Sequence, residues 1–357
     1  MYFRLKPSLR IYDFFDIDNT VKIGSNVPIS VTIELNDRKF LDVLKLLDGS
    51  NSVYDISKIL NIDYKELSDM LSMLFNDFNI IEKVSLQTYF SEEEIDYYKK
   101  QLDYYKIFPE TYKINPIDIQ KNIKNKKVTI LGCGGTGTNI LRDLSCIGIG
   151  EITLVDFDEI ELSNIGRQCL FDIDDIGKKK IEVAKEKIEK INPFIKVNVI
   201  DKKIKSIDDI SGEILNSDFL VLSADKPLNL FNWVNKKCID NKIPFLMLGL
   251  NEFNGKIGPL VVPNKTACIN CINIRHEKNN IYSKNILNQV DNYKFPWSEA
   301  TNISIIRLIS SIASFEVFRF LICGNSKLEN KTLIFNPYEF KFEEELWEKE
   351  EECDVCN

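Results

Sequence analysis

A cluster of glycines near the middle of the chain has the spacing of a phosphate-binding turn. Gly132, Gly134 and Gly137 form a G-x-G-x-x-G pattern, and Gly135 is an extra glycine within it. Glycines let the backbone approach a phosphate, and the first turn of a following helix presents free N–H groups to it. Asp156 follows about 20 residues later, where an acidic residue usually binds a ribose hydroxyl. The pattern predicts a nucleotide site, and an NAD-binding domain would share it.

The polar residues that follow indicate a triphosphate. Residues 156–168 read DFDEIELSNIGRQ, and residues 177–180 read GKKK. A triphosphate with Mg²⁺ requires cations for its β- and γ-oxygens and a carboxylate for the metal. Arg167 offers a fork of donors, and Lys180 offers a point charge at a helix start. Asp225 follows a buried strand, at the sheet edge where ligands bind.

Each of these residues also has an ordinary structural interpretation. Arg167 and Lys180 are equally typical of solvated surface charges, Asp225 of a helix cap and Asp158 of a turn. The functional interpretation depends on their joint occurrence.

Two cysteine pairs have the spacing of a zinc site. Cys268 and Cys271 form one C-x-x-C, and Cys353 and Cys356 form another. Four thiolates make a closed tetrahedral cage, which predicts a structural and not a catalytic metal; the alternative is buried free thiols. The start of the sequence lacks the apolar core of a signal peptide. We therefore expect a cytoplasmic protein with reduced cysteines, none of which stands out as a catalytic thiol.

Composition limits the partners. The 357 residues have a formal net charge of −8, which argues against nucleic-acid and anionic-membrane binding. The most apolar segment, 303–323, contains Arg307, Glu316 and Arg319 and is predicted to be a buried helix, not a membrane span.

Alternating strands and helices are expected to position the nucleotide residues. Apolar runs at 128–131, 152–155 and 219–222 predict buried parallel strands, so residues 126–357 should form a Rossmann-like α/β domain with a mostly parallel sheet. Residues from about 273 to 296 are polar without clear periodicity, and we interpret them as a functional crossover loop.

Residues 1–85 are expected to form a separate domain. Three short helices and small strands predict a winged-helix unit, with a linker helix region at 86–125. The unit has ten Lys or Arg against thirteen Asp or Glu, a net charge of −3. DNA binding, the common function of this fold, is therefore disfavoured.

The motif set resembles the ThiF/MoeB superfamily of adenylating enzymes, which are related to ubiquitin-activating enzymes. The resemblance covers about residues 115–357 and implies that Asp156 binds the ribose and Asp225 the Mg²⁺. It further implies that phosphates are bound by Asn164, Arg167 and Lys180, and that Arg167, Lys180 and Asp225 are catalytic. The rest of the implied nucleotide site consists of the four glycines, Asp158 and Gln168.

Residues 224–238, 258–271 and the final CDVC look closest to the microcin C-type (MccB) branch of this superfamily. Residues 46–60, LLDGSNSVYDISKIL, resemble peptide-clamp domains that hold ribosomally made precursor peptides. The resemblance implies a homodimer that uses ATP, or CTP as in some relatives, to modify a short ribosomal peptide ending in Asn. The implied product is a nucleotidyl-peptide with a P–N bond, made through a succinimide during antibiotic biosynthesis.

One departure concerns an arginine that the superfamily usually supplies from the partner subunit. The corresponding stretch, DYYKKQLDYY, contains Lys99 and Lys100 instead. A lysine lacks the bidentate geometry of arginine. Two other functions stay open: activation of a small carrier protein ending in Gly-Gly, and non-catalytic peptide delivery.

Overall fold

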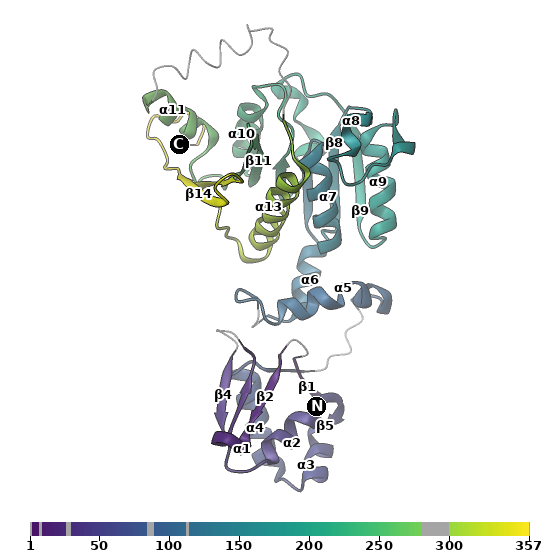
Figure 1. Cartoon of the computed structure of the whole chain (residues 1–357), viewed down its shortest axis with the longest axis vertical. Coiled ribbons are helices and arrows are strands. Elements are labelled where there is room, and N and C mark those ends of the chain that lie inside the picture. Colours follow the sequence, from purple (N-terminus) through teal and green to yellow (C-terminus); the bar gives the residue numbers. More distant parts are fainter. Residues whose placement is uncertain are drawn as a thin grey trace. The chain divides into compact units, whose positions relative to one another are not determined.

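The computed structural model describes residues 2–6, 9–25, 30–83, 89–111, 114–279 and 300–356. It divides into two compact units, Met1–Lys121 and Asn122–Asn357 (Figure 1). The helices expected in the linker region, α5 (Glu92–Tyr105) and α6 (Pro116–Lys124), thus belong mostly to the first unit.

The first unit combines two small sheets with a group of helices. One sheet has the order β5-β1-β6 and the other the order β2-β3-β4. These strands are β1 (Tyr2–Leu5), β2 (Ile11–Phe14), β3 (Thr20–Ile23), β4 (Val31–Glu34), β5 (Asp48–Ser52) and β6 (Ile81–Lys83). The helices are α1 (Phe15–Asp18), α2 (Lys39–Leu46), α3 (Val53–Leu60) and α4 (Tyr64–Asn76).

Local sequence explains where these helices begin. The side chains of Ser52 and Asp55 form a reciprocal capping box at the start of α3. Asp63 caps α4 by accepting hydrogen bonds from the first turn. Leu67 and Leu71 then lie one turn apart on the buried face of α4. Helices α2, α3 and α4 correspond to the three short helices expected from the sequence.

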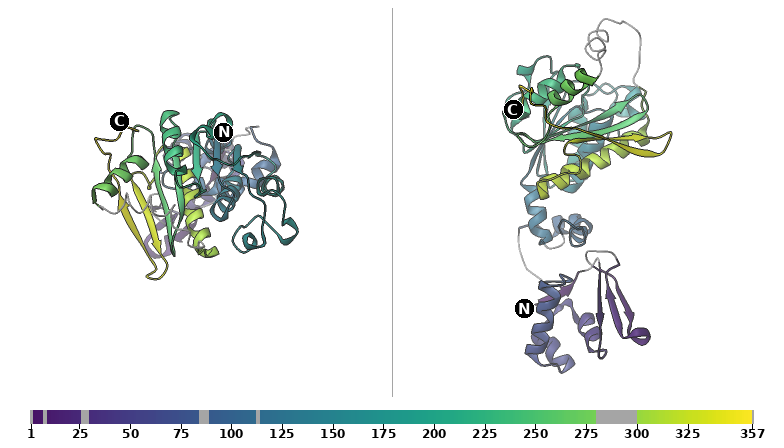
Figure 2. Two further views of the ribbon diagram at one scale, coloured as in Figure 1. Left: turned by 90° about the horizontal axis from the view of Figure 1, so that it is seen from above. Right: turned by 90° about the vertical axis from the view of Figure 1, so that its left-hand side faces the viewer.

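An eight-stranded sheet forms the centre of the second unit (Figure 2). Its order is β14-β13-β12-β11-β10-β7-β8-β9. The neighbours β11, β10, β7, β8 and β9 are parallel to one another. The pairs β11–β12, β12–β13 and β13–β14 are antiparallel. The strands are β7 (Lys127–Leu131), β8 (Glu151–Asp156), β9 (Lys196–Asp201), β10 (Phe219–Leu222), β11 (Phe245–Asn251), β12 (Asn254–Val261), β13 (Lys331–Asn336) and β14 (Lys341–Leu346).

The connections leave β7 in opposite directions across the sheet. From β7 the chain passes through α7 (Gly135–Ile147) to β8, and then through α9 (Lys180–Ile191) to β9. From β10 it passes through α10 (Leu230–Asp240) to β11, on the other side of β7. Strand order therefore reverses between β7 and β10, the point where doubly wound sheets bind ligands.

Helix α13 (Ile303–Cys323) packs against α7 and against β11 and β12. It is the helix predicted from the apolar segment, and it ends at Gly324 in the left-handed conformation. None of the helices in the described ranges is long and apolar enough to cross a membrane.

Residues 273–279, expected at the start of an irregular crossover loop, are instead the end of helix α11 (Ile269–Asn279). Tertiary contacts stabilise this polar helix: Lys278 ion-pairs with Glu350 at 2.8 Å, and the ring of His276 lies 5.4 Å from that of Trp347. The rest of the expected loop, 280–296, lies outside the described residues.

Candidate functional site

The glycine turn joins the end of β7 to the start of α7. Gly132 has a φ of +104°, and a Cβ there would lie 2.7 Å from the backbone nitrogen of Ala224. A Cβ on Gly137 would lie 2.0 Å from the carbonyl oxygen of Gly132. Gly134, at the N-cap of α7, instead faces open space. Two glycines thus permit close packing, and the third leaves the helix N-terminus open to an anion.

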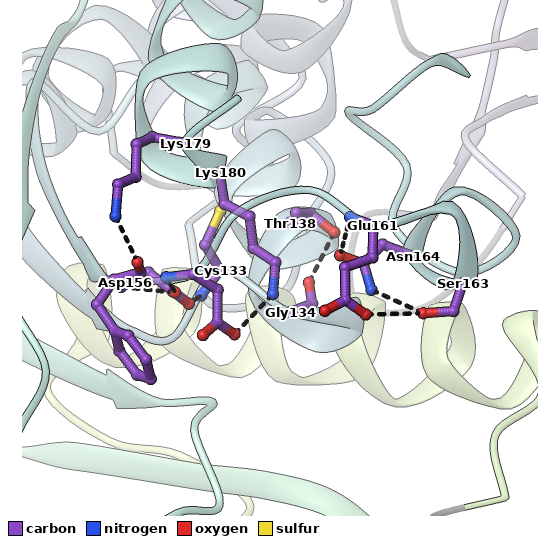
Figure 3. Close-up of polar contacts among 11 residues, drawn as sticks. Cys133, Gly134, Thr138, Asp156, Glu161, Ser163, Asn164, Lys179 and Lys180 are labelled. Carbon is purple, nitrogen blue, oxygen red and sulfur yellow. Dashed lines mark hydrogen bonds and ion pairs between the residues drawn. The ribbon is translucent and has the colours of Figure 1, made fainter. Parts of the chain in front are cut away.

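Asp156 ties the end of β8 to this turn (Figure 3). Its carboxylate accepts hydrogen bonds from the backbone N–H of Cys133 at 2.6 Å, Phe157 at 2.7 Å and Asp158 at 2.8 Å. A carboxylate has about four acceptor positions, so these three amides leave about one for another donor. Asp156 is therefore held rigidly and still suits a ribose hydroxyl.

Lys180, the first residue of α9, is paired with Asp158. The Lys180 side chain is only 8% exposed, and its Nζ donates to Asp158 Oδ2 at 2.8 Å. Neighbouring Lys179 donates to the carbonyl oxygen of Phe157 at 2.8 Å. The ammonium of Lys180 has three protons, so a phosphate oxygen could share it with Asp158.

The SNIGRQ segment forms the short helix α8 (Leu162–Ile165) and the turn after it. The side chain of Asn164 is buried and bonds to the backbone N–H of Glu161 at 3.1 Å. The guanidinium of Arg167 donates to the carbonyl oxygen of Ser163. Gln168 is 3% exposed, and its Oε1 has no hydrogen-bond partner among the described residues. A polar ligand group there would offset the cost of about 1–3 kcal/mol for an unpaired buried acceptor.

Asp225 is exposed in the loop that follows β10. Within the described part of the chain its carboxylate has neither a hydrogen bond nor an ion pair, and the oxygen of a free carboxylate suits Mg²⁺. The hydroxyls of Thr136 and Ser223, 2.6 Å apart, connect this loop to the first turn of α7. The loop therefore borders the glycine turn at the same sheet edge.

Hydrogen bonds of 2.6 and 2.8 Å join the glycine turn after β7 to Asp156, and Lys180 of α9 to Asp158. The SNIGRQ segment borders α7 near Gly135. Lys99 and Lys100 lie apart from them in sequence, on α5 of the first unit; both are exposed, and Lys99 lies 3.9 Å from Asp96. The sequence analysis missed the Cys133 amide and the Thr136–Ser223 pair, because neither has a signal apart from the folded turn.

Thiols near the nucleotide residues are poor nucleophiles. Burial raises the pKa of Cys133 well above its ordinary value, and burial likewise raises the pKa of Cys169. Both side chains therefore stay protonated at neutral pH, and a thiol is far less nucleophilic than a thiolate. The raised pKa values of Cys133 and Cys169 therefore disfavour these two thiols as acceptors of an activated carboxyl group.

The two cysteine pairs converge on one point. Cys268 and Cys271 stand at the start of α11, and Cys353 and Cys356 in the C-terminal segment. All four are buried, and their sulfur atoms lie within 4.8 Å of one another. Four sulfur pairs are 3.4–4.0 Å apart. A zinc tetrahedron with bonds of about 2.3 Å has edges of about 3.8 Å, so the arrangement fits Zn²⁺.

Hydrogen bonds to sulfur support this centre. Asn270 donates to Cys353 Sγ at 3.5 Å, and the backbone N–H of Glu350 donates to Cys271 Sγ at 3.4 Å. Burial raises the pKa of Cys268 to about 11. For Cys353, hydrogen bonds from the amides of Val355 and Cys356 outweigh burial and lower the pKa to about 7. N–H donors of this kind orient and stabilise thiolate ligands.

Comparisons with known proteins cover the part of the chain that contains these residues. The ThiF family model matches residues 98–355. The molybdopterin-synthase adenylyltransferase of Salmonella typhimurium is 23% identical over 237 residues, which are 66% of this chain and 89% of that protein. The sulfur carrier protein ThiS adenylyltransferase of Escherichia coli is 26% identical over 156 residues, 44% of this chain and 61% of that protein.

Solved structures match over the full length. E. coli MccB with AMPCPP and selenomethionine MccA superposes with a TM-score of 0.76 and 28% identity, covering 100% of both chains. E. coli MccB with ATP gives a TM-score of 0.76 and 27% identity, again over 100% of both.

Proposed function

Because the chain belongs to the ThiF family, we propose that it is a peptide nucleotidyltransferase. It activates the C-terminal carboxylate of a short ribosomal peptide ending in Asn, with Mg-ATP or Mg-CTP. The observation that carries the peptide assignment is the full-length likeness to MccB solved with MccA, which includes the N-terminal unit. The Salmonella adenylyltransferase, in contrast, matches two thirds of the chain.

Each group of site residues has a role in this proposal. The N-terminus of α7 and Asn164, Arg167 and Lys180 bind the phosphates, and Asp156 binds the ribose. Asp225 binds Mg²⁺, which neutralises charge on the phosphates when it is bound. The chain therefore acts mainly by positioning reactants and balancing charge.

The chemistry needs no protein nucleophile. A peptide carboxylate is already ionised at neutral pH, so it attacks the α-phosphorus directly and pyrophosphate leaves. The side-chain amide nitrogen of the terminal Asn then attacks the activated carbonyl carbon, loses a proton and expels the nucleoside monophosphate as a succinimide closes. Finally the succinimide nitrogen loses its proton to solvent and attacks the α-phosphorus of a second nucleotide, and a P–N bond forms as pyrophosphate leaves.

The first unit holds the peptide in this proposal. An extended peptide can add as a strand to the edge of one of its small sheets, and the net charge of −3 over residues 1–85 disfavours nucleic acid as the partner. We further propose a cytoplasmic homodimer, in which Lys99 or Lys100 replaces the arginine from the partner subunit, and a structural zinc ion at the four cysteines. The product would be a microcin C-like antibiotic.

A second candidate is activation of a carrier protein ending in Gly-Gly, which the two named adenylyltransferase relatives favour. Both functions share the first adenylating step. Cys133 and Cys169 have raised pKa values, which disfavours a thioester route to a carrier. A non-catalytic delivery protein would not need the arrangement of Asp156, Lys180 and Asp225.

Mass spectrometry distinguishes these functions. The purified chain is incubated with Mg-ATP or Mg-CTP and a set of short synthetic peptides ending in Asn, MccA among them. The proposal expects a peptide product heavier by one nucleotidyl group. If no peptide yields product or pyrophosphate, whereas a Gly-Gly-ended carrier releases pyrophosphate, the carrier function is correct instead.

A further inference from the structure

The hairpin formed by β11 and β12 extends beyond the end of the neighbouring strand. Leu222, the last residue of β10, pairs with Met247, and β11 continues for four more residues to Asn251. Asn251 pairs with Asn254 across the turn. The end of this hairpin therefore lies past β10 at the sheet edge that also carries Asp225.

The two faces of this hairpin differ. A Cβ on Gly255 would lie 2.5 Å from a side-chain carbon of Ile309, so α13 covers that face. Gly249 pairs with Lys256, so both residues lie on the opposite face, since neighbouring pairs alternate sides. A Cβ on Gly249 would meet no atom within 4 Å. This face is consequently open at Gly249.

Two polar side chains on the open face have no partners in the described part of the chain. Lys256 is half-buried and makes no ion pair or hydrogen bond there. Asn254 lies on the same face, and its Oδ1 is buried without a hydrogen-bond partner. A half-buried ammonium and an unsatisfied amide both lose hydration without compensation. Their natural complement is a ligand with an anion and an N–H donor.

We propose that Lys256 and Asn254 form the subsite for the last residue of the peptide. Lys256 binds the terminal carboxylate, and Asn254 binds the side-chain amide of the terminal Asn. This inference rests on the proposed function and adds the residues that select its substrate. The nucleotide residues follow β7 and β8, whereas this face lies beyond β10. A carboxylate held there would lie at the same edge of the sheet as the glycine turn and Asp225.

Substitution of Lys256 tests the carboxylate contact. In Lys256→Met the KM for the most active peptide of the set should rise about ten- to hundred-fold, the effect of losing a hydrogen bond to a charged group. The Kd for Mg-ATP should stay unchanged, which also shows that the variant is folded. Lys256→Arg should retain most of the affinity. The matched control is Lys331→Met on β13, where the lost lysine pairs with Glu344.

An unchanged peptide KM in Lys256→Met would overturn the proposal. A rise in the Kd for Mg-ATP that matches the rise in peptide KM would overturn it too, because Lys256 would then bind phosphate. Both outcomes leave the proposed function intact, since wild-type turnover is measured in the same series. Wild-type protein without any peptide-dependent pyrophosphate release would instead refute the proposed function and the subsite together.

A double-mutant cycle tests the amide contact. Wild-type protein and Asn254→Ala are compared by pyrophosphate exchange, with peptides ending in Asn or in Ala. The first adenylating step requires only the carboxylate, so both peptides can report it. We expect Asn254→Ala to lower kcat/KM several-fold with the Asn peptide and hardly at all with the Ala peptide. Equal losses with both peptides would mean that Asn254 does not contact the terminal side chain.

Discussion

Gly134→Ala should separate nucleotide binding from folding. The new Cβ would meet no atom within 4 Å, and the φ of −84° at this position suits alanine. Two small effects on stability oppose each other. Alanine restricts the unfolded chain, which stabilises the folded protein by about 0.4–1 kcal/mol. Alanine is also a poorer N-cap than glycine, which destabilises it. The free energy of unfolding should therefore change by less than about 1 kcal/mol.

Nucleotide binding should respond much more strongly. The methyl group would occupy the space through which a phosphate reaches the N–H groups of α7. Losing one charge-assisted hydrogen bond costs about 1.5–3 kcal/mol, so the Kd for Mg-ATP should rise about ten- to hundred-fold. Isothermal titration calorimetry measures this Kd, and urea denaturation measures the free energy of unfolding.

Gly137→Ala is the matched control. Its Cβ would lie 2.0 Å from the carbonyl oxygen of Gly132, so α7 must shift and stability should fall by about 1–3 kcal/mol. Unchanged Mg-ATP affinity in Gly134→Ala would refute the assignment of the glycine turn as a phosphate site. A large loss of stability in Gly134→Ala would contradict the described geometry.

Three further predictions concern other parts of the second unit. Asp225→Ala should abolish nucleotidyl transfer with unchanged unfolding, because the exposed carboxylate has no partner in the described ranges; full activity would remove it from the site. Metal analysis should find one zinc per chain, lost in Cys353→Ser; less than about half an equivalent in wild-type protein would count against the four-thiolate centre. Burial opposes ionisation of Asp175, but hydrogen bonds from Lys187 and others prevail and lower its pKa to about 2. The ionised Asp175 side chain contributes its full stability above the unfolded pKa near 4, and this contribution is lost as the pH falls toward 2. In Asp175→Asn the urea midpoint should therefore fall less steeply between about pH 4 and pH 2 than in the wild type. An equally steep fall in both proteins would mean that other groups cause the loss of stability.

Features with short sequence spacing were predictable. A G-x-G-x-x-G run constrains one turn, and the structure shows why: Gly132 and Gly137 touch backbone that a side chain would displace. Each C-x-x-C likewise encodes half of a metal centre locally. The contact between the two pairs is long-range in sequence. It was still predictable, because four thiolates are the usual ligand set of a structural zinc ion.

Features that depend on long-range pairing were not predictable. Strand β12 contains Gly255, Gly258 and Pro259, residue types that normally argue against a strand. It exists because β11 and β13 pair with it on both sides. The position of Lys256 opposite Gly249 follows only from that register. Residues 273–279 were misjudged for the same reason, since their helix depends on contacts with the C-terminal segment.

The pairing of Lys180 with Asp158 lies between these cases. Both residues belong to the motif, but their contact is set by how α9 begins beside the end of β8. Sequence spacing placed them in one site and could not tell which of them faces a ligand and which neutralises the other.

The stoichiometry of the reaction tests the central claim most directly. With an Asn-ended peptide and Mg-nucleotide, the proposed sequence of steps consumes two nucleotides for each nucleotidyl-peptide. Quantitative phosphate analysis and mass spectrometry should therefore find two pyrophosphates and one free nucleoside monophosphate per product. One pyrophosphate per modified peptide, with no free monophosphate, would mean that the chain stops at a simple acyl-adenylate and would contradict the succinimide route.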